Sequence, residues 1–270
     1  SATLGWLLRI IFILVYCWSG IHKLNIHFID DIFPWLMEPV VSGQWISNSG
    51  FALAAGFIEL GIGIGLSLKF TRKTAVIILV IFHLCILYIL GPLGHNWNTV
   101  VWPWNVLMPL VAIGLFFSTV TYSIDRQIIY FTKNPIAWAI VFLVGLAPFF
   151  NTIKITPEQL SFKMYAGSQP EVVFYFDNED KPFFSTTKTN YSSLALGSPP
   201  IHRFQLDDVA FSEFGTPLFT TEKTAMKIGK TLCQRLSRPD LGGIWYLEVD
   251  LWDREGGRFE QISCAELMNR

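Results

Sequence analysis

Three ionisable residues, Lys23, Glu59 and His83, lie in or beside long apolar stretches of this sequence. Ionisable groups are costly in hydrocarbon and commonly mark functional sites when they occur within membrane spans. Glu59 and His83 sit at matching depths of two neighbouring antiparallel stretches, where a carboxylate and an imidazole could pair. Such a pair could relay a proton or hold a polar ligand such as a quinone head group. Equally, it could be a polar clamp that ties helices together.

The stretches that carry these residues predict a membrane protein. Only 15% of residues are charged, against about a quarter in soluble domains. A bilayer core of about 30 Å is crossed by a helix of about 20 apolar residues. We therefore expect a bundle of about five transmembrane helices, with Arg9 inside the first span and no signal-peptide cleavage site after it. The expected spans are residues 4–22, 51–68, 74–91, 105–121 and 136–150.

The remainder of the chain carries an ordinary density of charge. We expect residues 1–152 to form the transmembrane bundle and residues 153–270 to form a small soluble α+β domain. Its expected elements are a hairpin over 171–184, a helix over 221–236 capped by Thr220 or Thr221, and paired strands over 244–252 and 258–264. The domain contains no phosphate-loop motif. Cys233 and Cys264 could pair in an oxidising compartment or remain two free thiols.

Basic residues in the connections predict the orientation. Lys69, Arg72 and Lys73 follow the second span, and Arg126 and Lys133 follow the fourth. Because basic connections stay in the cytoplasm, the N-terminus is expected inside and the C-terminal domain outside. This arrangement predicts a multi-pass protein of the bacterial inner membrane with a periplasmic C-terminal domain.

The two connections expected on the outer side are unusually apolar. Residues 21–50 predict an amphipathic or re-entrant helix at the interface. Residues 91–105 contain His95, Trp97 and Trp102, which could belong to an aromatic belt or to a lid over an outward-facing site. His22 and His27 are five residues apart, which does not align them on one helix face. No HExxH motif occurs, so we predict no metal site.

Several short motifs resemble those of the DoxX-like family of small bacterial membrane proteins. They are Arg9, Gly20-x-x-Lys23-Leu24, Gly56-Phe-Ile-Glu59-Leu-Gly61-Ile-Gly63 and Arg72, within about residues 4–120. This family is grouped with MauE-like proteins and, distantly, with the membrane domain of vitamin K-dependent carboxylases. The resemblance implies a four-helix core, to which this chain adds a fifth span and a C-terminal domain. It also implies that Glu59 and Lys23 are the positions of interest. Family members are linked to thiosulfate:quinone oxidoreduction, thiol homeostasis and maturation of partner proteins.

These observations lead to one expected function and two alternatives. The expected function is an accessory or structural subunit of an envelope membrane complex, whose partners are membrane lipid and other envelope proteins. The net charge of −1 and the absence of a basic run exclude nucleic acid as a partner. The sequence has no haem, flavin, CxxC or iron–sulfur signature, which argues against an enzyme with its own redox group.

The first alternative is a quinone- or thiol-linked membrane oxidoreductase, or a quinone-binding protein, that uses Glu59, His83 and Lys23. Further candidate ligand-binding residues for bound quinone or lipid are His22, His95, Trp97 and Trp102. The second alternative is a small-solute transporter.

Overall fold

The chain contains two compact units. One, the helical unit, comprises Ser1–Asn96 and Val101–Gly167, and the other, the sheet unit, comprises Trp97–Val100 and Ser168–Arg270. The computed structural model describes residues 2–41, 49–117, 134–152, 161–163, 166, 170–177, 192–194, 201–214, 221–249 and 257–269. Each unit is presented below by itself.

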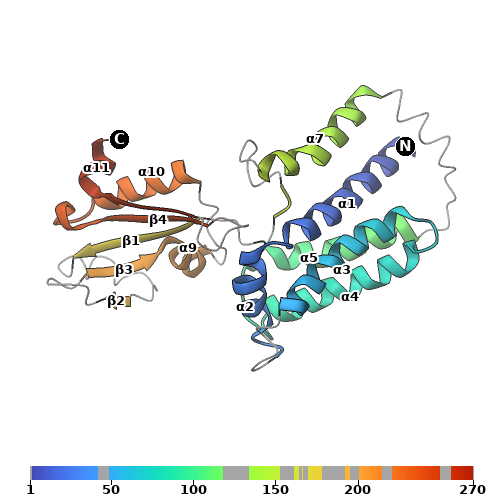
Figure 1. Ribbon diagram of the computed structural model, residues 1–270, viewed down its shortest axis with the longest axis horizontal. Helices are drawn as coiled ribbons and strands as arrows, with labels where there is room; N and C mark the ends of the chain where they lie inside the picture. Colours follow the sequence, from blue (N-terminus) through green and yellow to red (C-terminus); the bar gives the residue numbers. More distant parts are fainter. Residues whose placement is uncertain are drawn as a thin grey trace. The chain divides into compact units, whose positions relative to one another are not determined.

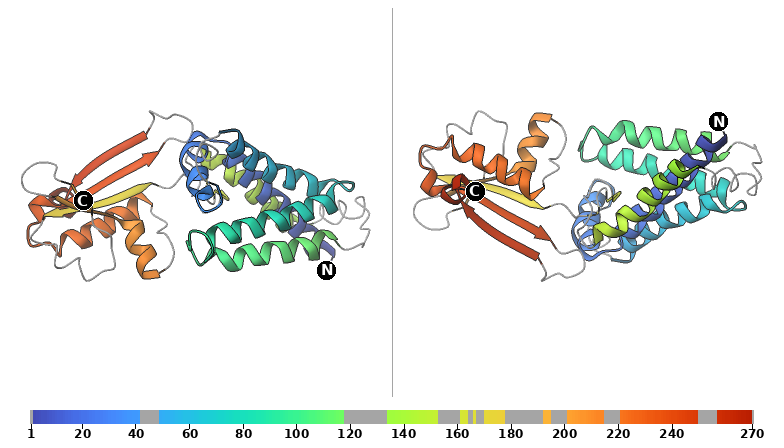
Figure 2. Two further views of the ribbon diagram at one scale, coloured as in Figure 1. Left: turned by 90° about the horizontal axis from the view of Figure 1, so that it is seen from below. Right: turned by 90° about the horizontal axis from the view of Figure 1, so that it is seen from above.

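The helical unit consists mainly of α-helices (Figure 1). Its long helices are α1 (Ala2–His22), α3 (Ser49–Ser67), α4 (Arg72–Leu90), α5 (Val101–Ala112) and α7 (Pro135–Thr152). A π-helical turn, η3 (Ile113–Phe117), continues α5. Helix α1 packs against α3 and α7, and α4 packs against α3 and α5. The unit is therefore a helical bundle, as its two further views show (Figure 2).

Three of the described helices are long and apolar enough to cross a membrane, by length and composition. They are Leu4–His22 within α1, Ser49–Ser67 and Arg72–Leu90. These agree with the first three predicted spans to within a few residues. The fourth and fifth predicted spans correspond to shorter apolar helices, Val101–Phe117 and Pro135–Asn151. Residues 118–121 of the fourth lie outside the described residues. The five-span bundle thus stays a prediction.

Small residues bring α1 and α3 into close contact. A Cβ atom at Gly20 would lie 2.4 Å from the Leu60 backbone nitrogen and 2.8 Å from the Gly56 carbonyl oxygen. A Cβ atom at Gly63 would lie 2.9 Å from the backbone nitrogen of Cys17. Small residues allow this kind of close backbone approach between membrane helices. The approach brings the side chains that flank these glycines within hydrogen-bonding range.

The surfaces of the bundle helices are apolar on the outside as well as the inside. The interior is built by side chains of α1, α3, α4, α5 and η3, including Phe12, Ile62, Leu66 and Leu79. On the outside, large apolar side chains are exposed, including Phe57 of α3, Ile81 and Leu84 of α4, and Phe142 of α7. Exposed apolar side chains on the outside of apolar helices fit contact with lipid chains.

The segment that follows α1 is helical, as predicted for part of residues 21–50. A π-helical turn, η1 (Phe28–Ile32), leads into the short helix α2 (Phe33–Met37). Phe28 and Phe33 are buried with Ala52 of α3 in a small apolar cluster. The segment is therefore held against α3, and residues 42–48 lie outside the described residues.

An antiparallel sheet of five described strands forms the centre of the sheet unit, in the order β2-β3-β1-β4-β5. The strands are β1 (Glu171–Asp177), β2 (Ser192–Leu194), β3 (Ile201–Gln205), β4 (Gly243–Val249) and β5 (Gly257–Ser263). The helices are α9 (Leu206–Phe214), α10 (Glu222–Cys233) and α11 (Cys264–Asn269), and a 3₁₀ turn, η6 (Pro239–Leu241), precedes β4. Side chains of all three helices share one apolar core with alternate residues of the sheet.

Several predicted elements of this unit are confirmed. Strands β4 and β5 pair as an antiparallel hairpin, from Gly243 opposite Ser263 to Val249 opposite Gly257. Thr221 caps α10, because its side chain accepts a hydrogen bond from the Thr224 backbone. Strand β1 pairs with β3 and β4 on its two sides. The predicted return strand over 181–184 lies outside the described residues.

Candidate functional site

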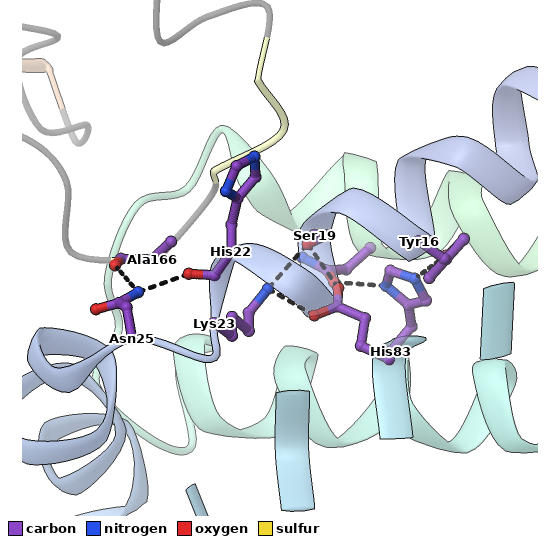
Figure 3. A network of polar contacts seen from close by, with 9 residues as sticks. Tyr16, Ser19, His22, Lys23, Asn25, His83 and Ala166 are labelled. Carbon is purple, nitrogen blue, oxygen red and sulfur yellow. Dashed lines mark hydrogen bonds and ion pairs between the residues drawn. The ribbon is translucent and has the colours of Figure 1, made fainter. Parts of the chain in front are cut away.

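One face of α1, together with the residue that directly follows the helix, carries three polar side chains that lie inside the helical unit. Tyr16, Ser19 and Lys23 are spaced by three and four residues, so they fall on one side of the helix. All three are buried. Each bonds to a side chain of another residue on this face or of a facing helix, which creates two polar clusters within the apolar bundle (Figure 3).

The first cluster is an ion pair closed by a serine. The Lys23 Nζ lies 2.6 Å from Glu59 Oε2 and donates a hydrogen bond of 2.9 Å to Ser19 Oγ. Ser19 Oγ in turn donates to Glu59 Oε1 over 2.8 Å. Only 9% of Lys23 and 6% of Glu59 are exposed, so both charges are largely removed from solvent. Such charges are tolerated inside a protein when they are paired and hydrogen-bonded. The cluster joins α1 to α3.

A tyrosine, a histidine and an asparagine form the second cluster. His83 Nδ1 lies 2.7 Å from Asn105 Oδ1, and the other amide atom, Asn105 Nδ2, donates to the Val101 carbonyl. Because the amide oxygen only accepts, His83 must carry its proton on Nδ1. His83 Nε2 then accepts the hydrogen bond from the Tyr16 hydroxyl, over 2.5 Å. The cluster joins α1 to α4 and α5.

The two clusters involve Glu59 and His83 separately. The sequence allowed a direct contact between these two residues, but neither bonds the other. Glu59 instead pairs with Lys23, and the imidazole of His83 bonds through both ring nitrogens to uncharged partners. The carboxylate therefore faces a cation that compensates its charge better than a neutral imidazole could.

Hydrogen bonds between side chains and backbone groups fix the C-terminal end of α1. Asn25 Nδ2 donates to the carbonyl oxygens of His22 and Ala166, over 2.6 and 3.0 Å. The His22 ring stacks on that of Trp18, with ring centroids 5.5 Å apart, and it hydrogen-bonds to the backbone of Ser161. The buried His22 Nε2 has no hydrogen-bond partner. Ser161 and Ala166, which follow α7 in the sequence, thus lie beside the end of α1.

The remaining predicted ligand-binding residues have other contacts. His95 stacks on Trp35, with ring centroids 4.4 Å apart, and bonds the Trp35 carbonyl. Trp102 donates to the Leu90 carbonyl at the end of α4. Trp97 belongs to the sheet unit. The structure therefore does not bring these three residues together with Glu59 and His83 through any described hydrogen bond.

Cys233 and Cys264, whose pairing the sequence left open, form a disulfide. Cys233 ends α10 and Cys264 begins α11, and their Cα atoms are 5.4 Å apart. Both cysteines are fully buried in the core of the sheet unit. The bond therefore joins two helices on the same side of the sheet.

Sequence reasoning missed the uncharged members of the two clusters: Tyr16, Ser19 and Asn105. A signal was present for the first two, since they share the helical face of Lys23 at spacings of seven and four residues. Asn105 lies at the edge of an apolar stretch, where an asparagine is unremarkable. Within the described part of the chain, no group of three metal-ligand side chains comes together.

Chemically, the two clusters can hold helices together, and their groups can also exchange protons. Each of the six side chains bonds to another member of its own cluster, which favours a structural role. Comparison of the chain with protein-family models, curated proteins and solved structures finds no match.

Proposed function

We propose that this protein is an accessory subunit of a bacterial inner-membrane complex, similar to DoxX-like proteins. In this proposal the helical bundle is the membrane anchor, and the C-terminal domain is the periplasmic part that docks envelope proteins. The observation that carries the proposal is that the buried polar groups are paired with one another. Glu59 forms an ion pair with Lys23 and accepts a hydrogen bond from Ser19, and both ring nitrogens of His83 are hydrogen-bonded to protein side chains.

This internal pairing supports a structural role for the buried polar groups. Polar side chains that bond across membrane helices stabilise the association of those helices. Here Ser19 and Lys23 at the end of α1 bond to Glu59 of α3, and Tyr16 of α1 bonds to His83 of α4, which bonds to Asn105 of α5. The clusters would then fix the positions of three helices, α3, α4 and α5, relative to α1, which is what an anchor requires.

The proposed orientation is supported by two independent features. Lys69, Arg72 and Lys73 lie at the α3–α4 turn, which fits the cytoplasmic side by the distribution of basic residues. The disulfide between Cys233 and Cys264 fits an oxidising compartment such as the periplasm, where disulfides persist.

The test is purification from native membranes in mild detergent, followed by mass spectrometry of all copurified proteins. A stoichiometric set of envelope proteins is expected. Phe259 is 61% exposed on the edge strand β5, and exposed aromatic side chains are typical of protein interfaces. We expect Phe259→Ser to reduce partner recovery and Lys227→Ser, an exposed change on α10, to leave it unchanged. Recovery of the wild-type chain without any protein partner would contradict the proposal.

A second candidate function is the binding of a polar ligand, such as a quinone, near the end of α1. It is favoured by the buried His22 Nε2 that has no partner, and by the Lys23 ammonium, which uses two of its three N–H groups. In this case the purified protein would carry a small molecule detectable by organic extraction and chromatography. Both His22→Phe and Glu59→Gln would abolish its retention. A chain that purifies alone with such a molecule would replace the subunit proposal by this one.

A further inference from the structure

The turn between α3 and α4 combines basic and aromatic side chains. It consists of residues 68–71, and Arg72 and Lys73 open the following helix. Because both flanking helices are long enough to cross a membrane, a four-residue connection between them must lie at the membrane surface. Its side chains therefore meet lipid head groups or the adjacent aqueous layer.

Side chains of the turn satisfy the last carbonyl groups of α3. Thr71 Oγ1 donates to the Gly65 carbonyl over 2.9 Å, and Arg72 Nε donates to the Leu66 carbonyl over 3.1 Å. Arg72 Nη2 also reaches the Ser67 carbonyl, at 3.4 Å. These bonds occupy acceptors that a helix end otherwise leaves open. Thr71 and Arg72 thus stabilise the end of α3, whereas the neighbouring side chains do not take part in these bonds.

Those neighbouring side chains are two lysines and a phenylalanine. Phe70 is 96% exposed, the highest exposure among the large apolar residues of the described chain. Lys69 is exposed and forms no ion pair with any described residue. The Lys73 ammonium lies 5.9 Å from the centroid of the Phe117 ring, a cation–π contact that does not neutralise its charge. The turn thus presents two uncompensated cations beside one apolar side chain.

No described acid of the helical unit lies near this turn in the fold. Asp30, Asp31 and Glu38 belong to the segment between α1 and α3, at the opposite end of α3, and Glu59 is paired with Lys23 inside the bundle. Arg9 adds a further cation at the same end as the turn, where its Nε donates to the Leu115 carbonyl of η3. The described charged residues at this end of the bundle are therefore all basic.

We propose that the turn, through Lys69, Phe70 and Lys73, binds the head groups of anionic phospholipids. Juxtamembrane lysines are attracted to anionic lipid by about fivefold in affinity each, the equivalent of about 1 kcal/mol. An exposed phenylalanine beside them can enter the boundary between head groups and acyl chains. A soluble acidic protein would satisfy the lysines but would leave Phe70 without an apolar environment. The lipid surface satisfies both, and the two spans already hold the turn there.

The test compares lipid binding by the full-length, delipidated protein in detergent, using native mass spectrometry. The protein is titrated with phosphatidylglycerol or with phosphatidylcholine of the same acyl chains. The test variant is Lys69→Gln/Lys73→Gln, and the matched control is Lys223→Gln/Lys227→Gln, which removes two exposed lysines of α10. Arg72 is kept because it bonds the end of α3.

We expect the test variant to weaken the tightest phosphatidylglycerol binding by about 25-fold, from about fivefold for each lysine. Phosphatidylcholine binding is expected to be unchanged in both variants, and phosphatidylglycerol binding to be unchanged in the control. Phe70→Ala should weaken both lipids. The proposal is overturned if the test and control variants lose the same amount of phosphatidylglycerol binding. The net charge of the protein, and not the position of the lysines, would then explain the binding. It is also overturned if the test variant binds phosphatidylglycerol as tightly as the wild-type chain does. Loss of a copurified acidic protein from that variant would then identify a protein as the occupant of the turn.

Discussion

The ion pair between Lys23 and Glu59 offers the sharpest perturbation of the bundle. Lys23→Met removes the ammonium and leaves the Glu59 carboxylate buried with only the Ser19 hydroxyl as a partner. Removal of one member of a buried ion pair costs about 3–5 kcal/mol, because the remaining charge is uncompensated. Replacement of both members by apolar residues of similar volume is often neutral or stabilising. We therefore expect Lys23→Met to be strongly destabilising, and Lys23→Met/Glu59→Met to recover most of that loss.

The assay is a reversible titration of the detergent-solubilised protein with sodium dodecyl sulfate, followed by far-UV circular dichroism. Lys227→Met is the control, because this exposed lysine of α10 has no ion pair among the described residues and lies outside the proposed lipid-binding turn, so its replacement should change the free energy of unfolding by under about 0.5 kcal/mol. A Lys23→Met loss no larger than that of the control would refute the reasoning. A double variant that is less stable than Lys23→Met would do so as well.

Three further predictions concern other contacts. Gly20→Ala should destabilise the bundle by about 1–3 kcal/mol, since its Cβ would meet the α3 backbone, whereas Gly61→Ala has open space and should be neutral or stabilising in the same titration. Tyr16→Phe should cost about 1–3 kcal/mol, because it leaves a buried imidazole nitrogen unbonded, and a loss below that range would contradict the assigned bond. Cys233→Ser/Cys264→Ser opens a loop with a sequence separation of 31 and should destabilise the sheet unit by about 3–4 kcal/mol in thermal unfolding. No shift in the unfolding midpoint would show that the bond is dispensable.

Much of the fold is predictable from the sequence because its signals are local. The first three spans are set by the lengths of apolar runs, and these agree with α1, α3 and α4. The hairpin of β4 and β5 follows from alternation on both sides of a turn, and the α10 cap follows from Thr221. The order of the five strands depends instead on pairing between segments far apart in sequence, for which no local signal exists.

The site was predictable only in part, for a similar reason. Glu59, His83 and Lys23 stand out because ionisable residues are rare in apolar stretches. Their partners depend on how the helices are rotated about their axes, which no local pattern gives. Close packing at Gly20 and Gly63 holds α1 against α3, and Lys23 lies at the carboxylate of Glu59 in this arrangement.

The proposed periplasmic docking domain and the lipid-binding turn both require the ends of α3 to face opposite sides of the membrane. The most direct test labels single cysteines at these ends, Glu38→Cys before α3 and Lys69→Cys after it, in a chain with Cys17→Ser and Cys85→Ser. A membrane-impermeant maleimide applied to intact spheroplasts should label the cysteine at 38. It should label the cysteine at 69 only after permeabilisation. Labelling of both positions in intact spheroplasts, or of position 69 alone, would contradict the account.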